Sequence, residues 1–233
     1  MLKPFNINIL LYHQVGEILP NDINLDCFCT TSEFYRQMHF LKQSNYKVIS
    51  LYEALAFNSQ EVDRNYIVLT FDDGCEKFYD TIFPILDSFN FTATIYPITG
   101  FLGKFFTQNG KHYPHLKILS EVMLQELSTL GVEIGAHTVN HHKLTRISKS
   151  DAEFQVNYSK DYLEQLLGKQ IHSFSYPHGD YNDETISIVK ESGFTNALTC
   201  KSGFAHDAPS FFEIPRKYIT YFDNIDNFIH KLN

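Results

Sequence analysis

Short apolar runs alternate with amphipathic stretches along most of this chain, and this alternation limits what it can fold into more than any other feature. The pattern is typical of βα units that wrap helices around a parallel sheet or barrel. The strands expected from the apolar runs are Ile7–Tyr12, Tyr66–Phe71, Ala93–Pro97, Val132–Ala136, Phe174–Tyr176, Asn196–Thr199 and Tyr218–Tyr221. Because 43% of the 233 residues are apolar, we expect one α/β domain that spans residues 1–233.

Apolar residues recur at helical spacing between these runs. The helices expected from them are Ser32–Gln43, Glu76–Phe89, Ser150–Leu167 and Asp183–Ser192. Pro84 should kink the second of these or mark its late start. An aromatic stripe in the third, Phe154, Tyr158 and Tyr162, is expected to face the core. The segment Thr99–Lys117 is predicted to be a long irregular loop, either covering substrate or packing at the barrel rim.

Charge and composition exclude several classes of protein. The formal net charge is −8, and lysine and arginine form no cluster longer than a dipeptide, so nucleic acid is not an expected partner. No apolar run approaches the ~18 residues of a membrane span, and no signal peptide is visible, so we expect a cytoplasmic protein. The four cysteines are irregularly spaced, which favours free thiols in a reducing compartment. The oligomeric state is not predicted.

Two polar motifs close apolar runs and together contain the parts of a metal site. They are Thr70-Phe71-Asp72-Asp73-Gly74 and, about sixty residues later, His137-Thr138-Val139-Asn140-His141. Two histidines four residues apart can point from one helical turn toward one ion, and a carboxylate can complete a set of three protein ligands. A fourth position then stays open for water, and the second aspartate can accept a proton from that water. The motifs therefore predict metal-assisted hydrolysis.

Further polar residues also follow predicted strands. His13 comes after the first strand and Pro177-His178-Gly179 after a later one. In barrels and open α/β folds, the carboxyl ends of the strands form the face where catalytic groups converge. We therefore expect His13, the aspartate pair and the histidines to lie close together.

These motifs resemble those of the NodB-type polysaccharide deacetylases, carbohydrate esterase family 4, and the likeness covers most of the chain. The resemblance implies a distorted (β/α) TIM-like barrel. It also implies that Asp72 is the catalytic base and that Asp73, His137 and His141 bind the metal. The position of Leu11-Tyr12-His13 resembles the permuted branch of the family, in which this motif lies near the N-terminus and its histidine, here His13, is the general acid.

The segment Ser175-Tyr176-Pro177-His178-Gly179 resembles the third motif of the family but has a serine where the family has arginine. That arginine holds the base aspartate by a charge-assisted pair. Arg216 is a candidate replacement; the alternative is an ordinary surface arginine. By the same resemblance, the backbone N–H of His178 stabilises the oxyanion, and Tyr176 and Pro177 lie beside the substrate.

The function implied is a hydrolase that removes N-acetyl groups from an amino-sugar-containing glycan or glycan precursor and releases acetate. The cofactor expected is a divalent metal, first of all zinc, although cobalt, nickel and iron accept the same ligands. Two alternatives stay open. One is a barrel that binds carbohydrate but has impaired catalysis, and the other is a metal-dependent amidohydrolase acting on a small formyl or cyclic amide.

Overall fold

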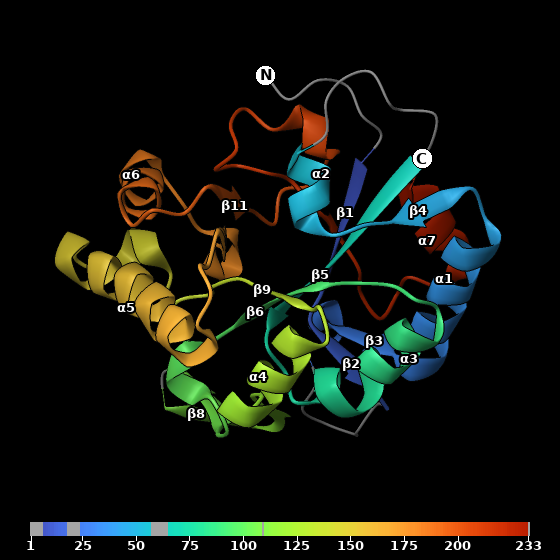
Figure 1. The fold of residues 1–233 in the computed structure, drawn as a ribbon, viewed down its shortest axis with the longest axis horizontal. Coiled ribbons are helices and arrows are strands. Elements are labelled where there is room, and N and C mark those ends of the chain that lie inside the picture. Colours follow the sequence, from blue (N-terminus) through green and yellow to red (C-terminus); the bar gives the residue numbers. More distant parts are fainter. Residues whose placement is uncertain (1–6, 18–23, 57–64, 109, 233) are drawn as a thin grey trace.

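The computed structural model describes residues 7–17, 24–56, 65–108 and 110–232, and Figure 1 shows their arrangement. At its centre is a parallel sheet. Its strands, in spatial order, are β12 (Lys217–Tyr218), β1 (Ile7–Tyr12), β5 (Asn65–Asp73), β6 (Thr94–Pro97) and β9 (Glu133–Ile134). A further strand, β4 (Tyr46–Val48), pairs with the first residues of β5. This parallel order confirms the expected α/β class.

Two more parallel strands continue the sheet into a distorted barrel. Strands β10 (Ser173–Ser175) and β11 (Asn196–Leu198) pair with each other. Isolated bridges join Ala136 to Phe174 and Leu198 to Ile214, which is three residues before β12. The hydrogen-bonded circle is therefore closed by single bridges on either side of the β10–β11 pair. Several strands are shorter than the apolar runs suggested, and β12 begins one residue earlier than expected.

The two faces of β1 and β5 contribute to different apolar clusters. Leu10 and Leu69 belong to the large cluster that also contains residues of the surrounding helices, whereas Ile9 and Val68 pack on the other face with Tyr96. Because side chains alternate along a strand, Thr70 and Asp72 share the face of Val68. Both side chains are buried, so Asp72 enters the barrel interior near its carboxyl end.

Helices surround the strands (Figure 1). They are α1 (Thr31–Gln43), α2 (Leu51–Ala56), α3 (Phe83–Ser88), α4 (Glu121–Thr129), α5 (Lys149–Leu167), α6 (Asp183–Glu191) and α7 (Ile225–Leu232). Side-chain caps from Thr30, Ser120, Ser148 and Asn182 accept backbone N–H groups at the starts of α1, α4, α5 and α6. Pro84 lies in the first turn of α3, after a π-helical turn over Phe78–Ile82, which agrees with a late helix start.

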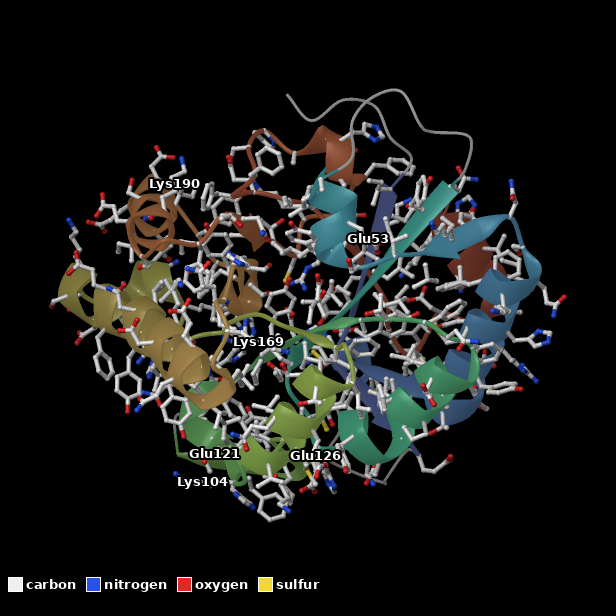
Figure 2. All side chains as sticks on the ribbon, in the orientation of Figure 1. Glu53, Lys104, Glu121, Glu126, Lys169 and Lys190 are labelled. Atoms are coloured by element: carbon white, nitrogen blue, oxygen red, sulfur yellow. The ribbon has the colours of Figure 1, made fainter. Side chains whose placement is uncertain are left out.

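Helix α4 is joined to its neighbours by two glutamates, both labelled in Figure 2. The hydroxyl of Tyr79, in the π-helical turn before α3, donates to Glu126, and that of Tyr162 on α5 donates to Glu121. These bonds lie on the exposed side of the helix layer, so they orient the helices without adding to the core.

The aromatic stripe on α5 does not face the core, contrary to expectation. Phe154 and Tyr158 are 52% and 48% exposed, whereas Ala152, Val156 and Leu163 are buried. The aromatic rings pack along the outside of the helix, with centroids of Phe154 and Tyr158 5.3 Å apart. The smaller aliphatic side chains on the opposite face allow α5 to approach the barrel closely.

The segment predicted to be an irregular loop is instead mainly an antiparallel hairpin. Strands β7 (Phe105–Gln108) and β8 (Lys111–Lys117) pair, with an irregular register between Phe105 and Thr107. Phe106 is buried in a small cluster with Cys75, Leu116 and Ile118. Cys75 lies two residues after Asp73 in the sequence. The hairpin therefore packs against the carboxyl end of β5. A shorter parallel pair, β2 (Gln14–Gly16) and β3 (Phe28–Thr30), flanks His13.

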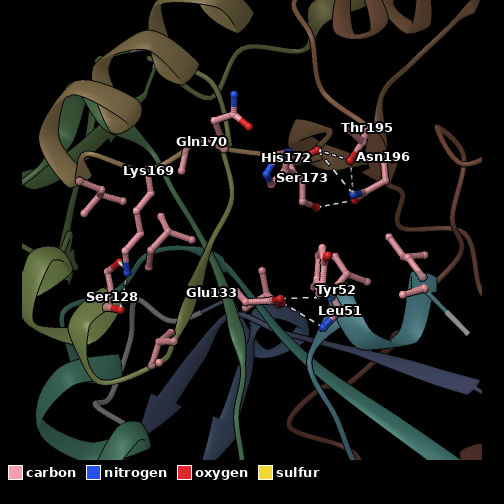
Figure 3. A pocket seen from close by; sticks show the side chains of 18 of the residues that line it. Leu51, Tyr52, Ser128, Glu133, Lys169, Gln170, His172, Ser173, Thr195 and Asn196 are labelled. Carbon is pink, nitrogen blue, oxygen red and sulfur yellow. Dashed lines mark hydrogen bonds between the residues drawn. The ribbon is translucent and has the colours of Figure 1, made fainter.

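A cavity of about 660 Å³ lies at the amino ends of β6, β9, β10 and β11 (Figure 3). Several of its polar side chains are hydrogen-bonded within the protein. Glu133 accepts the N–H groups of Leu51 and Tyr52 at the start of α2, and Lys169 donates to Ser128. These bonds join α2 to β9 and the segment after α5 to α4. None of the described helices is long and apolar enough to cross a membrane.

Candidate active site

A larger cavity, of about 970 Å³, opens at the carboxyl ends of the strands. The residues predicted from the sequence that border it are His13, Asp72, Asp73, His137, His141 and His178. They come from the ends of β1, β5, β9 and β10. The expected convergence of these segments is therefore what the structure shows.

Asp72 and Asp73 are adjacent in β5 yet both reach this cavity. Neighbouring side chains in a regular strand point to opposite faces. Asp73 breaks the alternation because its backbone is left-handed, with φ at 68°, and Gly74 follows at φ 74°. A Cβ on Gly74 would lie 2.7 Å from Cβ of Pro97, so the turn requires glycine.

His137 and His141 lie on a loop after β9, not on the helical turn predicted from their spacing. Thr138 and His141 have left-handed backbones, with φ of 65° and 58°. Oγ1 of Thr138 accepts the N–H of His141 at 3.0 Å, and Oε1 of Gln155 accepts two further N–H groups of the loop. These bonds, rather than helical ones, bring both imidazoles to the same side.

The loop places the two imidazoles against Asp73. Oδ1 of Asp73 lies 3.7 Å from Nε2 of His137 and 3.5 Å from Nε2 of His141. This oxygen is buried and has no hydrogen-bond partner among the described residues. The separations are close to the ~3.3 Å between ligands of a tetrahedral ion with bonds of ~2.0–2.1 Å. The three donor atoms therefore fit a divalent metal.

Burial keeps these histidines neutral, as metal ligands must be. It lowers the pKa of His137 to about 4 and, together with the nearby His178, that of His141 to about 3. Nδ1 of His137 donates to the carbonyl oxygen of Ser175 at 2.7 Å. That bond leaves the lone pair of Nε2 directed toward Asp73.

Asp72 has a different set of partners. Arg216 Nη1 donates to Asp72 Oδ1 at 2.8 Å and Nη2 donates to Oδ2 at 2.7 Å. Arg216 is fully buried, so the alternative of a surface arginine is wrong. Burial alone would raise the pKa of Asp72, but the guanidinium holds it well below its ordinary value. Asp72 is therefore a carboxylate in the folded protein.

Ser175 joins this pair, and the sequence reasoning missed its role. Its hydroxyl accepts from Arg216 Nη2 at 2.9 Å and donates to Asp72 Oδ2 at 2.9 Å. The only signal in the sequence was its position, where the resemblance led us to expect arginine.

His13 also borders the cavity. Its ring lies 5.1 Å from that of Tyr218 on the neighbouring strand, and its charge would lower the pKa of both Asp72 and His141. The side chain is therefore close to both halves of the site.

His178 and the hairpin form the remaining wall. The His178 backbone is left-handed, with φ at 58°, and its ring lies 4.3 Å from that of His141. Nε2 of Gln108 on β7 donates to the carbonyl oxygen of His141 at 2.9 Å and lies 3.5 Å from His178 Nε2. Sequence reasoning missed Gln108, because nothing local indicates which hairpin residue reaches the loop.

The side chains of Tyr176 and Pro177 are not brought to the cavity. Both residues are buried, and the Tyr176 ring stacks on Tyr181 at 5.1 Å. The expectation that they lie beside the substrate stays a prediction. Their backbone positions His178, since Tyr176 immediately precedes the turn that carries it.

The barrel and its carboxylate–histidine cluster thus define a protein with a candidate metal-hydrolase centre. Residues 59–197 match the family model described as polysaccharide deacetylase, which covers more than half of the chain. The chain belongs to the polysaccharide deacetylase family. The resemblance inferred from the sequence, and the class of carbohydrate deacetylase with it, are confirmed. Proteins of this family are generally metal-dependent.

Individual relatives agree with this assignment. The chain is 26% identical over 197 residues to the poly-beta-1,6-N-acetyl-D-glucosamine N-deacetylase of Staphylococcus epidermidis, covering 80% of this chain and 66% of that protein. It therefore spans about two thirds of that relative's length. Among solved structures, the Streptococcus pyogenes deacetylase PplD in complex with acetate is 27% identical, with a TM-score of 0.85 and coverage of 97% of this chain and 98% of that one.

A de-N-acetylase from Aggregatibacter actinomycetemcomitans shares the fold, with a TM-score of 0.82, 20% identity and coverage of 97% and 99%. The placement in a permuted branch and the extent of a single domain stay predictions.

Proposed function

We propose that this protein removes N-acetyl groups from an amino-sugar-containing glycan or glycan precursor and releases acetate. The observation that carries the proposal is the different surroundings of two adjacent carboxylates. Asp73 faces two neutral imidazoles, whereas Asp72 is held ionised by Arg216. One carboxylate can therefore bind a cation while its neighbour stays free to accept a proton, which is the division that metal-assisted hydrolysis needs.

Asp73, His137 and His141 would hold the cation, for which we propose zinc because two imidazoles and one carboxylate suit it. When bound, such an ion lowers the pKa of a coordinated water and polarises the amide carbonyl.

The protein's own groups would move the protons. Asp72 accepts a proton from the attacking water, and His13 donates one to the nitrogen of the leaving amine. The backbone N–H of His178 donates to the carbonyl oxygen as negative charge develops there, an interaction typically worth ~3 kcal/mol of barrier.

The two alternatives are weaker on this geometry. A barrel that only binds sugar was favoured by the missing arginine of the third motif, but Arg216, just before β12, makes a bidentate pair with Asp72. An amidohydrolase for a small formyl or cyclic amide would use the same residues. The activities named for the relatives, and a cavity of about 970 Å³, support an N-acetylated sugar instead.

The test measures zinc affinity and acetate release separately. Wild type should bind one zinc and release acetate from oligomers of N-acetylglucosamine. Asp72→Asn should bind zinc as tightly as wild type but lose turnover by about 10³-fold or more, because the base is gone. Asp73→Ala should lose both zinc binding and acetate release. Asp161→Asn, an exposed aspartate on α5, is the control and should change neither.

Equal loss of zinc in the Asp72 and Asp73 variants would contradict the assigned division of roles. Sugar affinity without acetate release by the zinc-loaded wild type would favour the binding barrel. Release of formate, but no acetate, from a panel of N-formyl and N-acetyl amides would favour the small-molecule amidohydrolase.

A further inference from the structure

We propose that Ser175 is a positioning residue that directs the basic oxygen of Asp72 and, through its carbonyl group, one metal ligand. The proposal rests on the proposed function, in which Asp72 accepts the proton of water. Ser175 is fully buried at the end of β10, and its hydroxyl and carbonyl oxygens contact the two halves of the site.

The direction of the hydroxyl proton follows from its neighbours. The guanidinium of Arg216 can only donate, so Oγ of Ser175 must accept from Nη2 at 2.9 Å. The single hydroxyl proton then points to Oδ2 of Asp72 at 2.9 Å. Ser175 thus relays a hydrogen bond from the arginine to the carboxylate.

The two oxygens of Asp72 become different as a result. A carboxylate oxygen has two acceptor positions. Oδ2 fills both, with Arg216 Nη2 and the Ser175 hydroxyl, whereas Oδ1 accepts only from Arg216 Nη1 within the described part of the chain. Oδ1 therefore keeps the open acceptor position, and we assign it as the atom that takes the proton.

Arg216 has no spare donor that could replace the serine. Its Nε donates to the carbonyl of Thr199 at 2.9 Å, and Nη1 also donates to Oγ1 of Thr70 at 3.2 Å. With the two bonds to Asp72 and the one to Ser175, all five N–H groups are used. Removing the hydroxyl would leave one guanidinium N–H and one carboxylate acceptor position without their partner.

The main chain of the same residue supports the metal side. The carbonyl oxygen of Ser175 accepts from Nδ1 of His137 at 2.7 Å. The backbone N–H of Ser175 donates to the carbonyl oxygen of Ala136 at 2.9 Å. A side-chain substitution leaves both of these bonds in place. The role of the hydroxyl can therefore be separated from the support of the metal ligand.

The experiment compares Ser175→Ala and Ser175→Cys with a matched control, Ser173→Ala. Ser173 lies on the same face of β10 and bonds to Asn196 and Tyr96, away from the site. For Ser175→Ala we expect kcat to fall about 10- to 100-fold, with KM and zinc affinity each within about threefold of wild type. Ser175→Cys keeps a weak donor, so its kcat should lie between those of Ser175→Ala and wild type. Ser173→Ala should keep the wild-type kcat.

A second measurement does not depend on activity. If the hydroxyl bonds to the carboxylate, Ser175→Ala should shift the urea midpoint less in an Asp72→Ala background than in wild type. Equal shifts, or an unchanged kcat in Ser175→Ala, would overturn the proposal. Loss of folding or of zinc binding in both Ser175 variants would give the residue a purely structural role and would also overturn it. If the two midpoint shifts differ but the wild-type protein releases no acetate, the result would contradict the proposed function instead.

Discussion

Four residues of the site have left-handed backbones although none is glycine. They are Asp73, Thr138, His141 and His178, with φ between 58° and 68°. A non-glycine residue in this conformation costs roughly 1–2 kcal/mol. The surrounding bonds stabilise it, such as those from the loop N–H groups to Gln155. These bonds hold the strained backbone, and the backbone in turn keeps three prospective ligands and the N–H of His178 in fixed directions.

The buried pair of Asp72 and Arg216 should be needed for stability as well as for orientation. Arg216→Met would leave a buried carboxylate without its cation, so we expect the free energy of unfolding to fall by about 3–5 kcal/mol. Urea denaturation of the metal-free protein measures this. Arg146→Met, an exposed arginine, is the control and should change stability by less than about 0.5 kcal/mol. Equal effects of the two variants would show that the pair adds nothing to stability.

At the scale of the elements, the strands were predictable and the packing of several other segments was not. Apolar runs revealed β1, β5 and β6 because buried parallel strands are nearly continuously apolar. On α5, the spacing of the aromatic residues and that of Ala152, Val156 and Leu163 both fit a helix, so periodicity could not tell which face is buried. The hairpin has an irregular register and exposed charged residues, so the alternation of its apolar and polar side chains was hidden.

The site was predictable where residue type and strand position were sufficient. Asp72, Asp73, His13 and the histidine pair could be placed at one face because they follow strands. The left-handed turns at Thr138 and His141 could not be predicted, since the spacing of His137 and His141 also fits a helical turn. Contacts over long sequence separations, such as Ser175 with Asp72 or Gln108 with His141, depend on the closed barrel and leave no local signal.

The hairpin should support the candidate metal site through Gln108. Its amide donates to the carbonyl oxygen of His141 at 2.9 Å, so Gln108→Ala would loosen the loop that carries this prospective ligand. We expect zinc affinity to fall on the order of tenfold, as for other partners that orient a ligand. Isothermal titration of metal-stripped protein measures this.

Gln125→Ala is the matched control, because Gln125 also donates to a backbone carbonyl, that of Leu166, on the outside of the molecule. Its zinc affinity should equal that of wild type. If both variants bind zinc equally well, the hairpin does not support the ligand.

At the scale of the whole molecule, one buried network joins strands from around the barrel. Thr70 on β5 donates to the carbonyl of Leu10 on β1 and accepts from Arg216, which precedes β12. The same guanidinium reaches Thr199 after β11 and Ser175 on β10. The circle of strands is closed by single bridges. Asp72, the proposed base, and its partners therefore lie where their hydrogen bonds also join strands at the carboxyl end of the barrel.

The stability of the metal-free molecule should consequently depend on pH through the buried histidines. Burial lowers the pKa of His137 to about 4 and that of His141 to about 3, whereas an unfolded histidine titrates near ~6.5. Between these values the unfolded state binds more protons than the folded state. The free energy of unfolding should therefore fall as the pH drops from ~6.5 toward 4, by up to about 1.4 kcal/mol per pH unit for each histidine.

Urea unfolding in the presence of a chelator at about pH 7 and about pH 5 measures this dependence. His137→Asn should lose about half of the difference between the two pH values, because one of the two buried titrating groups is gone. His39→Asn changes an exposed histidine on α1 and should keep the full difference. A wild-type stability that is the same at both pH values would mean that the imidazoles accept protons in the folded state. They would then be charged in the metal-free site, where the proposed mechanism requires neutral ligands ready to bind the cation.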